Sequence, residues 1–225
     1  MRQVPPADKP RKALPSRRGR APGRPAAGED LRGRLLDAAA QCFSRQGIAA
    51  TPLRAIAAEA GVNAALLHYY FGDKAQLQQA VIAERVLPAF MALREPLQAQ
   101  GDDVPGLVAA FVDGIGGIVA RHPWLPALWV REVLCEGGAL RDVLFDEISP
   151  QLPRMLAARF ARAQARGRID PALDPRLLVV SLVGLTLFPL AGAPVWQRML
   201  DAGDIGFDDL RRHALVLLDR GMGCA

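Results

Sequence analysis

Residues 51–74 constrain the fold of this chain more than any other stretch. Thr51 is a favourable N-cap residue, and Pro52 suits the first position of a helix because the N–H that proline lacks would have no partner there. Apolar residues then recur at helical spacing as far as Gly61, which can adopt the left-handed conformation that ends a helix. Asn63 can cap a second helix directly after this turn. The pattern predicts two short helices joined by a tight corner.

The second helix is expected over about residues 64–70. Leu67 and Phe71 lie four positions apart and give it one buried edge. Gly72 ends this helix, and Asp73 caps the next one. Helix-turn-helix proteins with this layout place their second helix in the major groove of DNA. The layout therefore indicates a DNA-binding unit.

These residues resemble the tetracycline-repressor (TetR/AcrR) family of bacterial regulators. The resemblance covers about residues 29–85, a quarter of the chain. It implies an all-α fold with a three-helix helix-turn-helix DNA-binding domain at 29–85 and a C-terminal helical effector-binding and dimerisation domain at 86–225. Residues 1–28 are basic and rich in proline and arginine, and their composition predicts a disordered arm. An ordinary three-helix bundle without a DNA role is the alternative. The residues that match the family pattern are Phe43, Gly47, Thr51, Ile56, Ala57, Ala60, Gly61, Val62, Asn63, Leu67, His68, Phe71 and Lys74.

The resemblance also implies which side chains contact DNA. His68 and Tyr69 match family positions that contact DNA, while Tyr70 and Lys74 match positions on the phosphate side. Arg54 lies in the first turn of the preceding helix, from which it can reach a guanine edge or a phosphate. The remaining candidates for DNA contact are Thr51, Asn63, Ala64 and Ala65.

Several of these residues depart from the family pattern or have a simpler explanation. His68 stands where the family usually has tyrosine, and Ala64 and Ala65 replace longer polar side chains, so they can offer only methyl contacts. The alternative for His68 is a partly buried ring packed against the first helix. Arg54 can instead neighbour Glu59 on a solvated face. For Thr51, helix capping alone is a sufficient explanation.

Positive charge is concentrated before the predicted DNA-binding domain. Residues 1–27 hold eight basic residues against one acidic residue, a net charge of +7, whereas the whole chain carries +5. Residues 29–78 balance five basic against five acidic residues. We therefore expect that deleting residues 1–27 flattens the salt dependence of DNA binding; an unchanged slope would contradict this. The arginines that resemble a minor-groove arm are Arg17, Arg18, Arg20 and Arg24, with a solvated tail as the alternative.

Helical sequence continues through the rest of the chain. Segment 177–196 has the length of a membrane span and carries no charge, but Gly184, Pro189, Gly192 and Pro194 interrupt it, so its second half is expected to turn. A helix at 175–188 is apolar on nearly every side and is therefore expected to be buried on two faces. The resemblance implies a homodimer through helices near 175–188 and 207–220, with no membrane. The other expected helices are 30–46, 74–93 with a bend near Pro88, 105–121, 124–136, 139–148 and 151–167.

A C-terminal domain of this kind should hold a pocket for an unknown small-molecule effector. Arg131 and Glu132 are expected either as a buried polar pair that faces the ligand or as solvent-facing residues. Ordinary core packing is the alternative for most of the aromatic candidates. The candidate lining residues are Phe111, Trp124, Trp129, Arg131 and Met155.

These observations predict a ligand-responsive transcriptional regulator. We expect a repressor that binds a palindromic operator on double-stranded DNA as a homodimer and is released by a small apolar or amphipathic effector. No cofactor, metal site or enzymatic activity is expected, and three widely spaced cysteines favour the cytoplasm. The alternatives are an architectural DNA-binding protein that uses its basic arm without a ligand, and an enzyme with an appended helix-turn-helix. The run at residues 114–117 is rich in glycine but lies in helical sequence, so it is not expected to bind phosphate.

Overall fold

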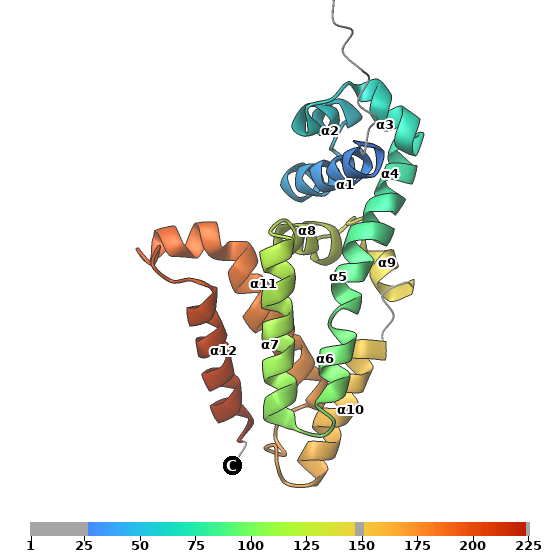
Figure 1. Ribbon diagram of the computed structural model, residues 1–225. Coiled ribbons are helices and arrows are strands. Elements are labelled where there is room, and N and C mark those ends of the chain that lie inside the picture. Colours follow the sequence, from blue (N-terminus) through green and yellow to red (C-terminus); the bar gives the residue numbers. More distant parts are fainter. Residues whose placement is uncertain (1–26, 147–150, 224–225) are drawn as a thin grey trace, which may run out of the picture.

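The computed structural model describes residues 27–146 and 151–223, and within these ranges every regular element is helical. Three helices form the upper part of the molecule in Figure 1: α1 (Ala27–Gln46), α2 (Leu53–Ala60) and α3 (Ala64–Phe71). The fourth helix, α4 (Lys74–Val81), packs against α1 and leads out of this part. We call α1–α4 the reader. The boundaries of α1, α2 and α3 and the start of α4 agree with the prediction to within a few residues.

The descent from the reader is less regular than the single bent helix expected over 74–93. A π-helical stretch, η1 (Ile82–Val86), follows α4 and is followed by α5 (Leu87–Met91) and α6 (Arg94–Ala99). Pro88 has no N–H to donate to the carbonyl of Glu84, one turn earlier. The guanidinium of Arg85 donates to that carbonyl instead, at 3.1 Å. In place of one bent helix, the structure thus has a change of helix type before Pro88 and a break before α6.

The lower part of the molecule is built around one long helix, α7 (Val104–Arg121). Its glycines allow close packing: a side chain at Gly116 would collide with the ring of Phe207, and one at Gly114 with Leu93. This glycine run thus serves helix packing. The elements that pack on α7 are α6, α10 (Gln151–Ala165), α11 (Pro175–Met199) and α12 (Phe207–Met222). Helix α8 (Leu125–Trp129) packs on α1 and on α11 and lies between α7 and the reader. It continues into η2 (Val130–Leu134), on which α9 (Arg141–Asp146) packs.

The prediction that the helix starting at Pro175 ends near residue 188 is wrong. In the structure α11 continues through Pro189 and Pro194 to Met199. Each proline leaves one helical carbonyl without its usual N–H partner, and a bend is the normal consequence. Figure 1 shows the last part of α11 turning away from its first part. The indole N–H of Trp196 donates to the carbonyl of Pro189 at 2.8 Å and helps to hold the bent segment together.

Two helices, α7 and α11, are long and apolar enough to cross a membrane if length and composition alone are considered. This is weak evidence, because core helices of soluble proteins pass the same test. The apolar stretch of α7 that could span a membrane is 44% buried inside the protein, whereas the corresponding stretch of α11 is only 28% buried. The apolar surface of α7 is thus used by its own domain, and much of that of α11 is left uncovered.

One apolar core runs through both parts of the molecule. Phe43 of α1 and Phe160 of α10 are both fully buried and belong to the same cluster of contacting side chains. Helix α1 also packs directly on α8, which ties the reader to the lower part. The two parts are therefore distinct in shape but continuous in packing.

Candidate nucleic-acid interface and effector pocket

The corner between α2 and α3 has the geometry that the sequence predicts. Gly61 has φ +67°, in the left-handed region, and its N–H donates to the carbonyl of Ala58 at 3.1 Å. The side chain of Asn63 accepts a hydrogen bond from the N–H of Ala65 at 2.9 Å and so caps α3. In the same way Asp73 caps α4 by accepting from the N–H of Gln76 at 2.9 Å. These local bonds set the direction in which α3 leaves the corner.

The prediction that Thr51 caps α2 is wrong. Pro52 occupies the N-cap position, without a side-chain cap bond, and Thr51 is completely buried. Its hydroxyl donates to the carbonyl of Gly47 at 2.6 Å and closes the loop between α1 and α2. A buried hydroxyl that is already engaged cannot reach a phosphate, so Thr51 is no longer a candidate for DNA contact.

Helix α3 presents one exposed face. Leu67 and Phe71 are buried as predicted, while Ala65, His68 and Tyr69 are exposed, Tyr69 to 81%. Ala64 was expected on the exposed face but is half-buried, because its side chain packs against the core. The interpretation of His68 as a ring packed against α1 does not agree with its exposure.

The ring of His68 is held in one orientation. Its Nδ1 lies 2.7 Å from the carbonyl oxygen of Gly72. Because a carbonyl only accepts, Nδ1 carries the proton in this bond, and in the neutral ring Nε2 is left as an acceptor. An acceptor on a helix face suits the amino groups of adenine or cytosine in the major groove.

Basic and aromatic side chains border this face. Lys74 donates to the carbonyl of Ala49 at 2.7 Å, and its ammonium keeps further N–H donors. Tyr70 is half-buried and meets the ring of Tyr69 edge to face at 5.3 Å. Arg54 is exposed, and Glu59, its suggested neighbour, pairs with Arg45 instead. The arm arginines Arg17, Arg18, Arg20 and Arg24 lie outside the described residues.

Ion pairs join α1 to the π-helical stretch that leaves the reader. The guanidinium of Arg32 binds the carboxylate of Glu84 and lowers the pKa of Glu84. A second ion pair joins Nε of Arg85 to Oδ1 of Asp37 at 2.6 Å. At the same junction, burial lowers the pKa of His122, and the positive charges of Arg121 and Arg85 act in the same direction. The orientation of α1 on η1 is thus set by charged contacts as well as by packing.

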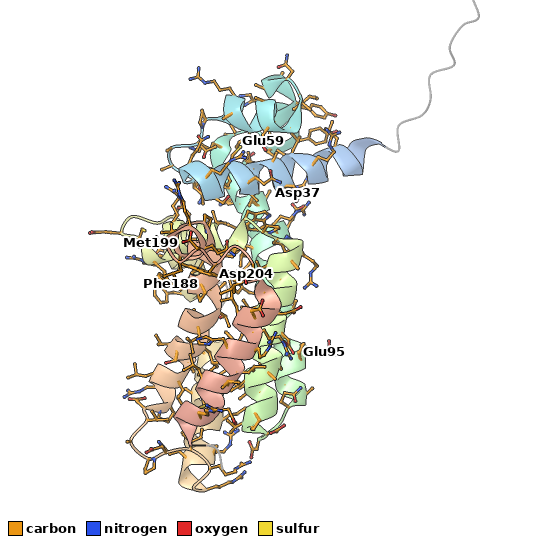
Figure 2. All side chains as sticks on the ribbon, turned by 90° about the vertical axis from the view of Figure 1, so that its left-hand side faces the viewer. Asp37, Glu59, Glu95, Phe188, Met199 and Asp204 are labelled. Carbon is orange, nitrogen blue, oxygen red and sulfur yellow. The ribbon has the colours of Figure 1, made fainter. Side chains whose placement is uncertain are left out.

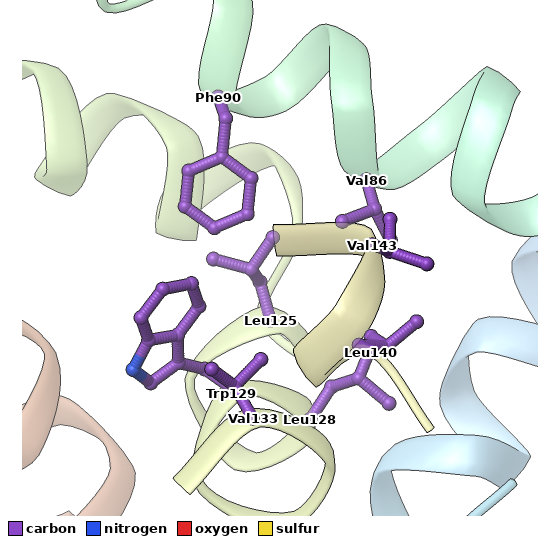
Figure 3. A pocket seen from close by; sticks show the side chains of 8 residues that line it. All are labelled: Val86, Phe90, Leu125, Leu128, Trp129, Val133, Leu140 and Val143. Carbon is purple, nitrogen blue, oxygen red and sulfur yellow. The ribbon is translucent and has the colours of Figure 1, made fainter. Parts of the chain in front are cut away.

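An apolar pocket lies directly below the reader (Figure 3). The side chains leave a free volume of only about 10 Å³ in it, so the pocket is nearly closed in this conformation. The indole N–H of Trp129, in its wall, is buried without a hydrogen-bond partner in the described part of the chain. The lining residues are Val86, Phe90, Leu125, Leu128, Trp129, Val133, Leu140 and Val143.

Of the predicted pocket residues, only Trp129 lines this cavity. Phe111 and Trp124 are buried in the core, and Met155 packs half-buried against it on α10. Arg131 is exposed, with its side chain beside Gly47. The other lining residues are the aromatic Phe90 of α5 and six aliphatic side chains from η1, α8, η2, α9 and the turn before α9. No sequence signal distinguishes the aliphatic ones from core.

Glu132 fits neither of the expected alternatives. It is 5% exposed, and its carboxylate accepts hydrogen bonds from the N–H of Ile48 at 2.8 Å and from the N–H of Ala139 at 2.9 Å. It therefore faces the reader and a neighbouring turn, with its partners supplied by backbone N–H groups. Sequence reasoning had no access to this contact because Ile48 and Glu132 are 84 residues apart.

Exposed apolar side chains gather on the last two helices. Eight of the twelve large exposed hydrophobic residues in the described part of the chain lie on α11, on its C-cap or on α12. Figure 2 shows Phe188 and Met199 on the same side of the molecule, at the end of the lower part nearest the reader. On α12, Ala214 and Leu218 face the core, and Leu217 is exposed. The eight residues are Leu177, Val180, Phe188, Val195, Met199, Leu200, Val216 and Leu217.

Comparison with known proteins places the chain among bacterial regulators. The family described as "Bacterial regulatory proteins, tetR family" matches residues 35–81. The nicotine-responsive transcriptional repressor HdnoR of Paenarthrobacter nicotinovorans is 42% identical over 165 residues, which cover 70% of this chain and 82% of HdnoR. The transcriptional repressor SCO4008 of Streptomyces coelicolor is 28% identical over 183 residues, covering 81% of this chain and 90% of that protein.

Solved structures agree in fold. The ketosteroid transcriptional regulator KstR2 of Mycobacterium tuberculosis superposes with a TM-score of 0.66 at 20% identity, covering 85% of this chain and 94% of its own. The regulator FadR of Bacillus subtilis, solved in complex with stearoyl-CoA, superposes with a TM-score of 0.60 at 19% identity, covering 84% of this chain and 98% of its own. With the cap-and-corner geometry of α2 and α3, the identity to HdnoR shows that this chain belongs to the TetR family of bacterial transcriptional regulators.

Proposed function

We propose that this regulator is a repressor that binds a palindromic operator as a homodimer and is released by a small apolar or amphipathic effector. The observation that carries the proposal is the single exposed face of α3, which bears Ala65, His68 and Tyr69 beyond a buried edge. In this division of labour, residues 29–85 contact DNA and residues 86–225 bind the effector and the second subunit. As a regulator, the protein would act in the cytoplasm.

The DNA contacts follow from the reader. His68 and Tyr69 would meet base edges in the major groove, while Lys74 and Tyr70 would contact phosphates. Ala65 would offer a methyl contact to thymine, and Asn63 would serve mainly to hold α3 in place. Arg54, which has no ion-pair partner within the described ranges, would reach a phosphate or guanine. The arm arginines would add sequence-independent attraction.

The dimer follows from the apolar face of α11 and α12. Eight large exposed hydrophobic side chains on two contacting helices are unusual on a soluble monomer and fit an interface between subunits. A second copy related by a two-fold axis would cover the same patch on both chains. Two readers would then meet half-sites about one turn of DNA apart.

The effector site would be the apolar pocket below the reader. Its walls carry aliphatic and aromatic side chains only, which favours an uncharged apolar group over an ionised one. The names of related proteins agree with an apolar or amphipathic effector, since HdnoR is called nicotine-responsive, KstR2 a ketosteroid regulator, and FadR was solved with stearoyl-CoA. The pocket is small in this conformation, so a ligand would have to expand it.

The test starts from fragments of the source genome that the purified chain selects. Binding of one selected fragment is measured by fluorescence anisotropy for wild type, His68→Ala and Arg54→Ala. Each variant is expected to weaken binding by roughly ten- to a hundredfold, as for the loss of a base or phosphate contact. Arg154→Ala is the matched control, because Arg154 is exposed on α10, away from the reader, and should bind like wild type. Equal binding by all four proteins would contradict the proposed interface.

An architectural role without a ligand is the second candidate, favoured by the net charge of +7 on residues 1–27. It predicts that binding is insensitive to DNA sequence and survives His68→Ala. Selection of a palindrome from the genomic fragments would exclude it.

A further inference from the structure

Glu132 is a buried carboxylate at the boundary between the effector pocket and the reader. It lies on η2, is 5% exposed, and has no ion-pair partner within the described ranges 27–146 and 151–223. Burying a carboxylate without a counter-charge is costly unless hydrogen bonds replace its hydration. Here two backbone N–H groups do so, one from Ile48 and one from Ala139.

On the reader side, the bond goes to the loop that joins α1 and α2. Ile48 is buried, and the preceding Gly47 has φ +87°. A Cβ at Gly47 would lie 3.2 Å from Oε1 of Glu132, so glycine permits this close approach. The same loop is bonded to Lys74 at the start of α4, whose ammonium donates to the carbonyl of Ala49. A shift of this loop would therefore move α2 and the start of α4 together.

On the pocket side, Glu132 is surrounded by residues of the pocket wall. Trp129 and Val133, on the same helical turn, line the pocket, as does Leu140. The N–H of Leu140 donates to the carbonyl of Glu132 at 3.1 Å. Gly138 approaches so closely that a Cβ there would lie 2.2 Å from the carbonyl oxygen of Glu132. The turn at 138–140 thus contacts both the backbone and the carboxylate of Glu132, so a movement of this turn acts directly on Glu132.

We propose that Glu132 is the positioning residue that transmits the state of the pocket to the reader. When the pocket expands, the wall segments around Trp129 and Leu140 move and draw the carboxylate away from the N–H of Ile48. The loop between α1 and α2 is then released and the reader changes its tilt. This inference rests on the proposed function, because it takes the apolar pocket as the effector site. Coupling of this kind needs an element with two arrangements whose populations both sites change. In this proposal the element is the hydrogen bond between Glu132 and Ile48, and its two arrangements are the formed and the broken bond.

The test uses a larger side chain in the pocket in place of the unidentified effector. Val143→Phe adds volume from α9, outside η2 and the 138–140 turn. Hydrogen exchange of the Ile48 amide is followed by NMR in wild type, Val143→Phe, Glu132→Gln and the double variant. Glu132→Gln keeps the size of the side chain but leaves one oxygen to serve two N–H groups.

Each single substitution is expected to raise Ile48 exchange at least about tenfold, as for loss of a hydrogen bond to a charged group. The double variant should exchange no faster than Glu132→Gln alone, because the pocket can act on Ile48 only through the carboxylate. Unchanged exchange in Val143→Phe, or two increases that multiply, would overturn the inference. Glu136→Gln is the matched control, since this exposed carboxylate lies four residues on and should leave Ile48 unchanged.

Two further measurements separate the possible failures. Exchange of amides in α1 and α12 shows whether Glu132→Gln remains folded, and Glu132→Asp, which keeps the charge but has a shorter reach, should reproduce its effect on Ile48. In parallel, Val143→Phe should weaken binding to the selected genomic fragment about tenfold in the wild-type background and have little effect in the Glu132→Gln background. If no fragment binds at all, the proposed function fails, while Ile48 exchange still decides the role of Glu132.

Discussion

The reader and the lower part of the molecule are built by different means. In the reader, α2, α3 and α4 have eight residues each, and a residue at the helix end fixes each boundary: Gly61 closes α2, Asn63 opens α3 and Asp73 opens α4. In the lower part, α11 has 25 residues and continues through two internal prolines. Short helices are unstable alone and need explicit ends, whereas a long helix held by packing tolerates a residue that would break an isolated one.

This difference concerns geometry more than stability. Both parts contribute to a single buried cluster, and α1 packs directly on α8. Local bonds thus orient the surface that is proposed to contact DNA, while the energy that keeps it folded comes from the whole molecule. Four experiments test this difference between the two parts.

The largest effects are expected from emptying the shared core. Phe43→Ala in the reader and Phe160→Ala in α10 should each lower the free energy of unfolding by about 3–5 kcal/mol, since both side chains are fully buried. Thermal unfolding followed by circular dichroism should give one transition for each variant. A separate early transition of the reader in Phe43→Ala would mean that the two parts fold independently.

The next largest effect concerns the exposed apolar face. Phe188→Glu places a charge in the proposed interface and should weaken dimerisation at least about thirtyfold, equivalent to a loss of about 2 kcal/mol. Sedimentation equilibrium measures the dissociation constant. Met91→Glu is the control, because Met91 is exposed on α5, outside this face. A wild-type protein that remains monomeric would refute the proposed dimer.

A smaller effect is expected from a comparison of Gly61, at a helix end in the reader, with Gly117, inside a helix of the lower part. Gly61→Ala should lower the free energy of unfolding by about 1–2 kcal/mol. No atom lies within 4 Å of a Cβ placed at this position, so only the left-handed backbone conformation opposes the side chain. Gly61→Asn should cost less, since asparagine tolerates this conformation better. Gly117→Ala, inside α7, should instead stabilise by about 0.5–1 kcal/mol. Urea unfolding measures all three, and equal signs for the two alanine variants would contradict the contrast.

The smallest effect is expected at the start of α11. The guanidinium of Arg176 and its backbone N–H lower the pKa of Asp174 from 3.8 to about 2. Because the folded pKa lies below the unfolded one, the stabilisation is complete above pH 3.8 and is lost as the pH falls toward 2. Asp174→Asn keeps a capping oxygen but cannot titrate. Its urea midpoint should therefore depend slightly less on pH between 4 and 2, and identical slopes would argue against this assignment.

The same two regions also differ in how far their structure could be predicted from the sequence. The corner at Gly61, the caps at Asn63 and Asp73 and the buried edge of α3 were predicted, because each depends on residues within four positions of one another. The capping role predicted for Thr51 is wrong, although it too is local. Pro52 takes the N-cap position instead, and the hydroxyl of Thr51 donates to the carbonyl of Gly47 and closes the loop.

What the sequence alone determined is the all-helical fold and the DNA-binding corner, since backbone conformation and capping bonds are settled by neighbouring residues. The tertiary structure was needed to show which side chains line the pocket, how far α11 runs, and that Glu132 reaches Ile48. These features arise where segments far apart in the chain pack together. A valine in a core and a valine in a pocket wall look the same in sequence, because burial depends on what lies opposite.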